Sequence, residues 1–478
     1  MLFNSFQFLV FFPIVTCLYF IFPQKYRWGI LLFASCYFYM VLIPIYILVM
    51  LATIFIDYFA AIQIDNFLSQ KRKKATLIFS IISTCAVLFI FKYFNFFIGN
   101  FNMLFQSMNW NYSIPLLEWI LPVGLSFHTF QSLSYVIEVY RGNQKAEKHL
   151  GIYALYVMFY PQLVAGPIER PQNLLHQFRI KHKFDQSRII LGLRRILWGM
   201  FKKVVIADRL GYYVNQVYDN PADYHGVTIY IATFFFAYQI YCDFSGYTDI
   251  AIGTAKVMGF DLMENFKLPY YSRSIKEFWS RWHISLSTWF KDYVYIPLGG
   301  NRKSVPRWIM NLFVTFLISG LWHGANWTFV AWGSLHGIYL IIENLIRPIK
   351  IKNHNKLIQF VQWFTTLNLV IFAWLFFRAN DLNSALLLIK NGFNFSFSES
   401  CYELKNFSWN NLYSEYWIAI ISIVFLEIVQ FASRKTTIEK YLENWPKFFR
   451  WSFYLILTEM IIWIGYYGME AKFIYFQF

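Results

Sequence analysis

Residues 44–68 read PIYILVMLATIFIDYFAAIQIDNFL, and Asp57 and Asp65 are the charged side chains among them. A run of about 20 mostly apolar residues is long enough to cross a bilayer as a helix. Similar runs recur along the 478-residue chain, which is 58% hydrophobic and 14% charged. Soluble domains carry about 25% charged residues and could not cover this much apolar side chain. The sequence therefore predicts an all-α integral membrane protein, because helices satisfy their own backbone hydrogen bonds in lipid.

The apolar runs give twelve candidate spans, near residues 5–23, 28–43, 44–68, 75–98, 116–139, 152–168, 190–216, 227–255, 308–345, 357–378, 413–432 and 451–469. Several contain Pro, Gly or many charges, so we expect about 10–12 crossings plus re-entrant and interfacial helices. Basic clusters such as Lys71–Lys74 fall in alternate loops, and the positive-inside rule makes these loops cytoplasmic. Both termini are then extracytoplasmic, and residues 379–412 form an outward loop. No soluble domain interrupts this single polytopic membrane domain, residues 1–478.

The net charge of +16 does not indicate a nucleic-acid partner, because the basic residues lie in loops between apolar runs. The expected environment of the chain is instead the lipid bilayer. Its five cysteines show no CxxC spacing, and four lie in apolar runs. They are typical of small core residues, so we expect no disulfide framework and no metal site.

Ionisable residues within membrane segments are costly and usually face a cavity or a partner, so they are the best functional candidates. The densest set lies in residues 268–304, LPYYSRSIKEFWSRWHISLSTWFKDYVYIPLGGNRKS. Read as one helix, this stretch places Glu277, Arg281 and Ser285 on one face and His283 on another. One interpretation is an amphipathic helix at the cytoplasmic interface with a charged outer face. The other is a functional site that includes His283.

A second candidate stretch, SGLWHGANWTFVAWGSLHG, covers residues 319–337. His323 stands close to Gly320 and Gly324, where another backbone or a substrate can approach. His336 lies thirteen residues further on, on a different helical face, so the two histidines do not form a ready metal pair. A buried histidine is often only a core hydrogen-bonding group. Between glycines it is better placed to accept a proton from an attacking hydroxyl and return it to a leaving group.

The remaining intramembrane polar residues favour structural roles. Residues 159–178, FYPQLVAGPIERPQNLLHQF, contain too many prolines for a regular helix, and irregular backbone at membrane depth must be buried in protein or line a cavity. We favour a structural re-entrant turn there over direct substrate contact. Asp243 and Asp249 are expected to hydrogen-bond between helices, although a catalytic role stays open, and His128 is expected to be a helix-packing group.

These stretches resemble the membrane-bound O-acyltransferase (MBOAT) family, and especially its bacterial branch of alginate and peptidoglycan O-acetyltransferase membrane subunits. The motifs that carry the resemblance are FYPQLVAGPIERP (159–171), FWSRWHISLSTWFKDYVYIPLGG (278–300) and GLWHGANWTFVAWG (320–333). The resemblance implies a polytopic helical bundle in which a cytoplasmic funnel meets an outer cavity at mid-membrane. It also implies that His323 matches the family's near-invariant histidine and His283 its second motif histidine.

The activity that the resemblance implies is O-acyl transfer in the bacterial cytoplasmic membrane. The acyl group, here acetyl, would pass from a cytoplasmic thioester, acetyl-CoA or an acyl carrier protein, towards an extracytoplasmic polysaccharide. An extracytoplasmic acetyltransferase partner, of the SGNH type or similar, would complete the transfer to peptidoglycan or an alginate-like polymer. No metal is implied.

The tail at residues 470–478 ends in FIYFQF, which resembles an FxYxxF motif of related D-alanyl-transfer systems of teichoic acid. Phe473, Tyr475 and Phe478 match the motif, and the resemblance implies that the tyrosine is a covalent acyl relay. The alternative is an interfacial anchor, because tyrosine is common at the ends of spans. With the motif and the outward placement of the tail together, we favour the relay.

A polysaccharide hydroxyl and a cytoplasmic thioester cannot meet across about 30 Å of hydrocarbon, which favours a buried transfer point. We expect His323 to be the general base there, with His283 orienting the donor or assisting proton movement. Arg273, Lys276 and Arg281 could bind the donor's phosphates. Two other classes stay open: a transporter or flippase without covalent chemistry, and an MBOAT enzyme that acylates a lipid or a protein.

Overall fold

The structure, a computed structural model, describes residues 1–346, 355–394, 413–467 and 473–474. Every regular element within these ranges is a helix, which confirms the all-α prediction. The predicted single membrane domain contains two compact units, residues 1–193 with 251–263, and residues 194–250 with 264–478. The chain passes from one unit to the other within helices α9 (Gln186–Met200) and α11 (Gly226–Met258), and again between Met263 and Glu264.

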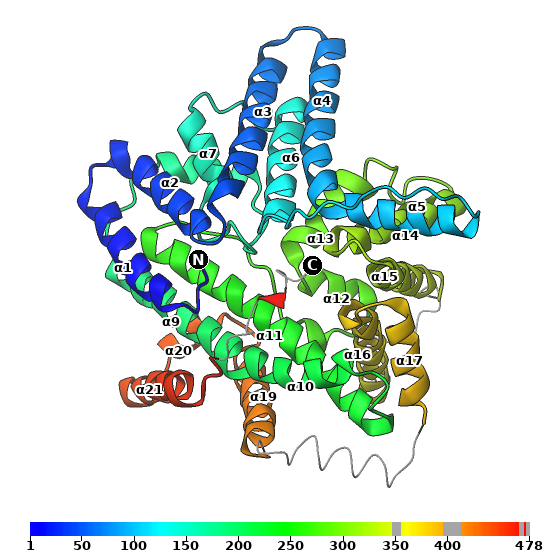
Figure 1. Cartoon of the computed structure of the whole chain (residues 1–478). Coiled ribbons are helices and arrows are strands. Elements are labelled where there is room, and N and C mark those ends of the chain that lie inside the picture. The colour runs from blue at the N-terminus through cyan, green and yellow to red at the C-terminus, as the bar shows by residue number, and fades with distance from the viewer. Residues whose placement is uncertain (347–354, 395–412, 468–472, 475–478) are drawn as a thin grey trace. The chain divides into compact units, whose positions relative to one another are not determined.

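The first unit contains short and long helices in chain order. They are α1 (Phe6–Ile21), α2 (Gln24–Met40), the 3-10 turn η1 (Pro44–Tyr46), α3 (Ile47–Asn66), α4 (Gln70–Leu88), the π-helical η2 (Phe89–Tyr93), α5 (Phe94–Ser107), α6 (Leu125–Arg141), α7 (Leu150–Met158), α8 (Pro171–Leu174), the 3-10 turn η3 (Leu175–Arg179) and the first half of α9. Figure 1 shows α3, α4 and α6 side by side, in blue and cyan.

Polar side chains join these three helices inside their apolar faces. The buried carboxylate of Asp57 on α3 accepts hydrogen bonds from Ser80, at 2.6 Å, and Thr84, at 3.0 Å, both on α4. The imidazole of His128 on α6 lies 2.5 Å from the hydroxyl of Thr53 on α3. A polar group that is removed from both water and headgroups needs such a partner. His128 is thus a helix-packing group, as predicted.

Residues 159–170 connect α7 to α8 without regular helix, as their prolines predict. Nearly all of these residues are buried, which is the condition under which irregular backbone survives at membrane depth. Glu169 fixes the segment twice: its carbonyl oxygen accepts from the Tyr156 hydroxyl at 2.8 Å, and its carboxylate accepts from the Met263 N–H at 2.6 Å. These contacts support the structural interpretation of this turn.

The second unit contains the two candidate histidines. Its elements are the second half of α9, the π-helical η4 (Phe201–Ala207), α10 (Asp208–Asp219), α11 up to Ile250, the 3-10 turn η5 (Pro269–Tyr271), α12 (Ile275–Arg281), α13 (Ile284–Phe290), the π-helical η6 (Lys291–Tyr295), α14 (Val305–His323), α15 (Trp327–Ile346), α16 (Lys356–Arg378), α17 (Leu382–Gly392), α19 (Tyr413–Ser433), α20 (Ile438–Glu443) and α21 (Lys447–Ile464).

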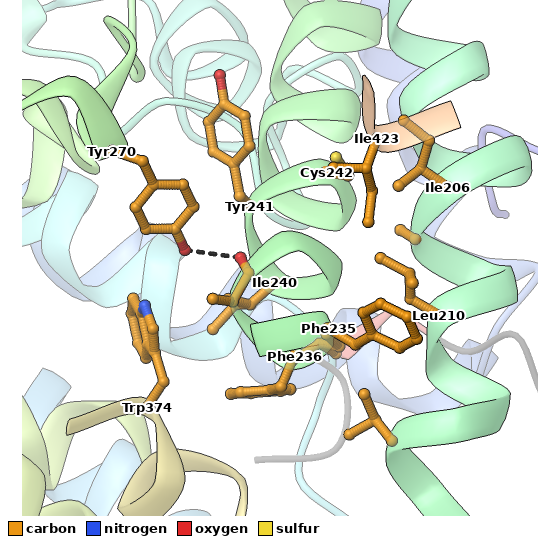
Figure 2. Packing of buried hydrophobic residues seen from close by; sticks show 14 of the residues in the cluster. Ile206, Leu210, Phe235, Phe236, Ile240, Tyr241, Cys242, Tyr270, Trp374 and Ile423 are labelled. Carbon is orange, nitrogen blue, oxygen red and sulfur yellow. Dashed lines mark hydrogen bonds between the residues drawn. The ribbon is translucent and has the colours of Figure 1, made fainter. Parts of the chain in front are cut away.

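The core of the second unit is aromatic and aliphatic. Figure 2 shows Phe235 of α11 beside Leu210 of α10, whereas Phe236 points to the other side, towards Trp374 of α16. The Tyr270 hydroxyl is satisfied by the carbonyl of Ala237 at 2.6 Å (Figure 2). This pairing removes the cost of burying a phenol among apolar groups.

Within the described residues, seven helical runs are long and apolar enough to cross a membrane: Pro44–Asn66, Gln70–Ser107, Gly226–Met258, Val305–His323, Trp327–Ile346, Lys356–Arg378 and Glu415–Ser433. The sequence predicted about 10–12 crossings. Some of the other predicted spans form shorter helices. The apolar helix Phe6–Ile21, for example, has 16 residues and is about 24 Å long.

Of the predicted outward loop 379–412, the structure describes residues 379–394, which include helix α17, and residues 395–412 lie outside the described part.

Candidate active site

His323 is the last residue of α14, at the turn of a tightly packed helical hairpin. Helix α14 ends because Gly324 leaves the helical conformation, with φ −161°. Helix α15 then packs along α14 through glycines. A Cβ atom on Gly320 would lie 2.3 Å from the carbonyl oxygen of Phe329, and one on Gly333 would lie 2.5 Å from that of Phe316. The close approach expected of glycines next to His323 is therefore present, and the second backbone is α15.

The imidazole of His323 is 5% exposed and contacts aromatic rings from three helices. Its ring centroid lies 4.9 Å from that of Trp322 on α14, 5.0 Å from Trp332 on α15 and 5.3 Å from Phe377 on α16. The ring of His336 also lies 5.0 Å from that of Trp332. His323 and His336 therefore lie on two different helices, and both contact the indole of Trp332.

His283 lies at a break between α12 and α13. Its backbone is left-handed, with φ 43°, and helix α13 begins at the next residue. The interpretation of residues 277–285 as one continuous helix is thus wrong, although Glu277 and Arg281, which it placed on one face, do lie together and pair at 2.6 Å. The break arises from Asn265, whose carbonyl oxygen accepts the Ile284 N–H at 3.0 Å and holds the chain out of helical register.

The side chain of Asn265 also determines the tautomer of His283. Its Oδ1 accepts hydrogen bonds from the Ser285 main-chain N–H, at 3.1 Å, and from the Ser285 hydroxyl, at 3.0 Å. The main-chain N–H can only donate, so the atom it meets is the amide oxygen and not the nitrogen. The His283 Nδ1, 3.1 Å from the same oxygen, must then carry a hydrogen. The lone pair is left on Nε2, and burial lowers the pKa of His283 to about 3.

The two predicted histidines meet the same indole. The ring centroid of Trp322 lies 6.3 Å from that of His283 and 4.9 Å from that of His323. The ring of Phe244 packs edge-on against His283 at 4.6 Å. Residues that are 40 positions apart in the sequence are therefore neighbours of one buried aromatic group.

The three predicted donor-binding cations do not line one cavity. Arg281 lines a cavity of about 690 Å³, which we call the charged cavity, together with residues that include Arg195, Lys202, Asp249, Glu264 and Arg434. Lys276 lines a second cavity of about 940 Å³, which we call the α14 cavity, together with residues that include Trp279, Lys291, Arg302, Lys303 and Ser319. Arg273 lines neither of these two cavities and is exposed.

Charged side chains on η4, α10 and α11 form ion pairs that the sequence analysis only partly recognised. Lys202 donates to Asp249 at 2.6 Å and to Ser245 at 2.9 Å. Lys203 donates to Asp243 and Asp208, each at 2.6 Å. The expectation that Asp243 and Asp249 bond between helices is met. The lysines were not singled out, although two cations within an apolar run are a usable signal.

Tyr475 lies outside the described residues, as does Phe478. Phe473 and Ile474, which precede Tyr475, are buried in the second unit. Among the described residues, no group of three or more His, Cys, Asp or Glu side chains could hold a metal ion.

Comparison with known proteins places this geometry in a family. The model of the membrane-bound O-acyltransferase family matches residues 149–386, a range that contains both His283 and His323. A probable alginate O-acetylase of Pseudomonas aeruginosa is 38% identical over 403 residues, which are 83% of this chain and 75% of that protein. This chain belongs to the membrane-bound O-acyltransferase family.

Other relatives of this MBOAT protein include a peptidoglycan O-acetyltransferase of Helicobacter pylori, 36% identical over 75% of this chain and 72% of that protein. A teichoic acid D-alanyltransferase of Bacillus subtilis is 29% identical over 52% of this chain and 65% of its own length. The predicted resemblance, the multi-pass helical fold and the O-acyltransferase class are confirmed. Family membership disfavours a transporter that performs no covalent chemistry.

Proposed function

We propose that this protein takes an acetyl group from a cytoplasmic thioester and passes it across the membrane for O-acetylation of an extracytoplasmic polysaccharide. The names of its relatives support an alginate-like polymer or peptidoglycan as the acceptor. The observation that carries the proposal is the pair of buried imidazoles, His283 and His323, at one indole. Two proton-accepting groups in a water-poor aromatic site suit acyl transfer, because water would otherwise compete for the thioester.

In this proposal His323 is the general base. The phenol of Tyr475 attacks the carbonyl carbon of the acetyl thioester, and His323 takes the phenol proton as the new C–O bond forms. The C–S bond then breaks, and the proton on His323 passes to the leaving sulfur, which departs as a free thiol. A phenol with its ordinary pKa near 10 needs such a base at neutral pH. The resulting phenyl acetate can then acylate a nucleophile on a partner, which regenerates the phenol.

His283 orients the donor or assists proton movement. The Asn265 acceptor fixes its tautomer, so that Nε2 is the ring nitrogen that carries the lone pair. Its lowered pKa keeps this ring neutral across the physiological range. A fixed neutral acceptor adds no charge to the site and needs no reorganisation during the reaction.

The α14 cavity is the proposed donor site, with acetyl-CoA as the donor and an acyl carrier protein as the variant that carries the same pantetheine arm. Ser319, which lines this cavity, is one helical turn from His323 on α14, so both residues lie on the same face. Trp279, also in its lining, contacts Trp332 at 5.7 Å, and Trp332 contacts His323.

The lining of the α14 cavity also contains the cations that a donor's phosphates require. They are Lys276, Lys291, Arg302 and Lys303. Of the three cations predicted from sequence, Lys276 is the one that this arrangement supports. Arg281 already pairs with Glu277 and lines the charged cavity, so its contribution and that of Arg273 would be to the general positive potential of this face.

The proposed setting is the bacterial cytoplasmic membrane with both termini outside. The positive-inside pattern supports this orientation, and it places Tyr475 on the side of the polymer. An extracytoplasmic partner, of the SGNH type or similar, would take the acetyl group from Tyr475 and transfer it to the sugar hydroxyl.

The test uses the purified protein in lipid nanodiscs with labelled acetyl-CoA. Transfer is measured by the release of free thiol and by mass spectrometry of the C-terminal peptide. His323→Gln should lower the transfer rate by roughly 10²–10⁴-fold, because it removes the base but not the packing. The matched control is His336→Gln, since His336 is equally buried and contacts the same Trp332 ring. It should keep transfer within a few-fold of the wild-type rate.

Three other results would contradict parts of the proposal. Full transfer by His323→Gln would remove His323 from the mechanism. Preference for long-chain acyl-CoA over acetyl-CoA would favour a lipid or protein acceptor. Movement of a substrate across the bilayer without thiol release would favour a transporter.

A further inference from the structure

Phe473 and Ile474, the two residues that precede Tyr475, are each 5% exposed and pack within the second unit. Ile474 belongs to the main hydrophobic cluster of that unit. The motif that contains Tyr475 is therefore attached to the helical core immediately before the tyrosine.

A buried carboxylate binds this attachment point through the main chain. The N–H of Ile474 donates to Asp243 Oδ2 at 2.9 Å. The other oxygen of Asp243 accepts from Lys203 Nζ at 2.6 Å, and the same ammonium donates to Asp208 at 2.6 Å. The side chains of Lys203, Asp208 and Asp243 are each less than 5% exposed. Charge-assisted hydrogen bonds in such a site are stronger than those in water.

The side chain of Phe473 meets the same group of residues. The ammonium of Lys203 lies 4.9 Å from the centroid of the Phe473 ring, within the range of a cation–π contact. The ring of Tyr247, one turn beyond Asp243 on α11, packs edge-on against Phe473 at 4.6 Å. The residues before Tyr475 are thus bound by a main-chain hydrogen bond, a cation and an aromatic ring.

The helix that presents Lys203 is unusual. Lys203 lies in the π-helical run η4, Phe201–Ala207, between α9 and α10. π-Helical turns are rare and are found frequently at functional sites. A second main-chain contact joins the same run to the C-terminal segment, because the N–H of Tyr466 donates to the carbonyl of Val204 at 2.8 Å.

We propose that Lys203, Asp208, Asp243 and Tyr247 form a tail anchor that positions Tyr475 for acyl transfer. The inference rests on the proposed relay function of Tyr475 and adds the residues that position it. Consecutive Cα atoms are about 3.8 Å apart, so fixing Ile474 restricts the volume that the next side chain can reach. Such a restriction raises the effective concentration of the phenol at the thioester.

A purely structural role for these charges is the alternative, and the adjacent lysine distinguishes the two. Lys202 is equally buried in the same π-helical run and also pairs with an α11 carboxylate, Asp249. Lys202 donates to Asp249 and Ser245, whereas Lys203 contacts both Asp243 and Phe473. Replacing either lysine disturbs a buried ion pair, but only Lys203 is part of the tail anchor.

The test compares Lys203→Met with Lys202→Met in the full-length protein in nanodiscs. The first readout is hydrogen exchange of the C-terminal peptide that contains the Ile474 N–H. The second is the rate at which acetyl label reaches Tyr475, measured over a range of acetyl-CoA concentrations. Lys203→Met should accelerate exchange in this peptide by at least about tenfold. It should also slow labelling roughly 10–100-fold, with little change in the KM for acetyl-CoA.

Lys202→Met should leave exchange at the C-terminal peptide unchanged even if thermal stability falls, and Lys203→Arg should restore much of the labelling rate. Because a buried lysine variant can fail to fold, Ile474→Pro gives an independent test. It removes the N–H that Asp243 binds without unpairing a buried charge, and Ile474→Val keeps that N–H. Ile474→Pro should slow labelling, and Ile474→Val should not.

The outcomes separate this inference from the proposed function. Faster exchange in Lys203→Met with an unchanged labelling rate would overturn the positioning role and leave the relay intact. Equal losses in Lys202→Met and Lys203→Met, in both readouts, would also overturn it. Transfer of acetyl by the wild-type protein with no label on Tyr475 would refute the relay itself, whatever the exchange data show.

Discussion

Two regions of the second unit surround a buried polar side chain with different kinds of neighbours. His323 packs against aromatic rings, with Trp332 at 5.0 Å and Phe377 at 5.3 Å. Around Arg195 the contacts are carboxylates: the guanidinium lies 2.9 Å from Asp249, 2.5 Å from Glu264 and 3.6 Å from Glu439. His323 and Arg195 are both buried, but only Arg195 has neighbouring charges that compensate its own.

The difference separates groups available for chemistry from groups committed to the fold. A charge that is paired at hydrogen-bond distance has its electrostatic interaction already satisfied, so it resists changes in protonation. An imidazole among rings can gain a proton transiently, and the quadrupole of an aromatic face can stabilise the cation that forms. We therefore expect substitutions in the charged region to affect stability first, and substitutions near the histidines to affect rate first.

The charged region should show the largest effect on stability. Arg195→Met leaves the buried carboxylate of Glu439 and the partly buried carboxylate of Asp249 with one cation fewer, and breaking such a network costs about 3–5 kcal/mol. The adjacent Arg194 is the matched control, because its partner Glu443 lies 3.8 Å away and is 48% exposed. Arg194→Met should cost less than about 1 kcal/mol.

Thermal unfolding of both variants in the same detergent measures this contrast. Equal stabilities for the two would show that the buried network around Arg195 does not hold these helices. The charged region would then not differ from the aromatic region in its effect on stability.

Near the histidines, the residue to change is Asn265, which positions His283. Asn265→Leu removes the acceptor for Nδ1, frees the ring to adopt the other tautomer, and should slow acetyl transfer by roughly 10–100-fold. Asn311→Leu is the control, because Asn311 is also buried and donates elsewhere, to the Gly300 carbonyl at 3.1 Å. It should affect stability more than rate.

The pH profile of Asn265→Asp separates positioning from packing. In the wild-type protein burial holds the pKa of His283 near 3, so its ring stays neutral throughout the neutral range. A carboxylate at position 265 favours the protonated ring and raises the pKa of His283. Activity should therefore be kept at high pH and lost at a higher pH than in the wild type as the solution is acidified. An unshifted profile would mean that His283 does not need to be neutral.

The sequence could predict those features that depend on composition and local backbone. The apolar runs require a membrane, the prolines of residues 159–171 prevent a helix, and the glycines beside His323 allow a second backbone to approach. The motifs also selected His283 and His323 as candidates, and the structure places both rings beside Trp322. Each of these inferences depends on residues that are adjacent or nearly adjacent in the chain.

Features set by distant partners could not be read in the same way. The break at His283 depends on Asn265, eighteen residues earlier. A helical wheel of residues 277–285 does not include Asn265 and therefore cannot predict the break. The partner of each lysine in η4 depends on how α11 is rotated about its axis relative to η4. The spacing of hydrophobic residues in the sequence does not specify this rotation. For the same reason, Arg273, Lys276 and Arg281 were grouped by sequence, but Lys276 and Arg281 line different cavities and Arg273 lines neither of them.

The smallest effect in this series concerns packing. Gly320→Ala would place a Cβ atom 2.3 Å from the Phe329 carbonyl oxygen and 3.2 Å from the Gly333 Cα, so α14 and α15 would have to separate. Overpacking of this kind costs about 1–3 kcal/mol. Because His323 lies one turn further along α14, the same separation should move its ring from Trp332 and lower the transfer rate as well.

Gly29→Ala is the control for the intrinsic effect of the substitution. Gly29 lies in α2, and a Cβ atom there would meet nothing within 4 Å. Alanine at an unstrained helical position is neutral or stabilising by up to about 1 kcal/mol. If Gly320→Ala matched Gly29→Ala in both unfolding temperature and transfer rate, the α14–α15 contact would not determine where His323 lies. The aromatic region would then owe its geometry to Phe377 and α16 instead, which a Phe377→Leu variant would reveal as a loss of rate.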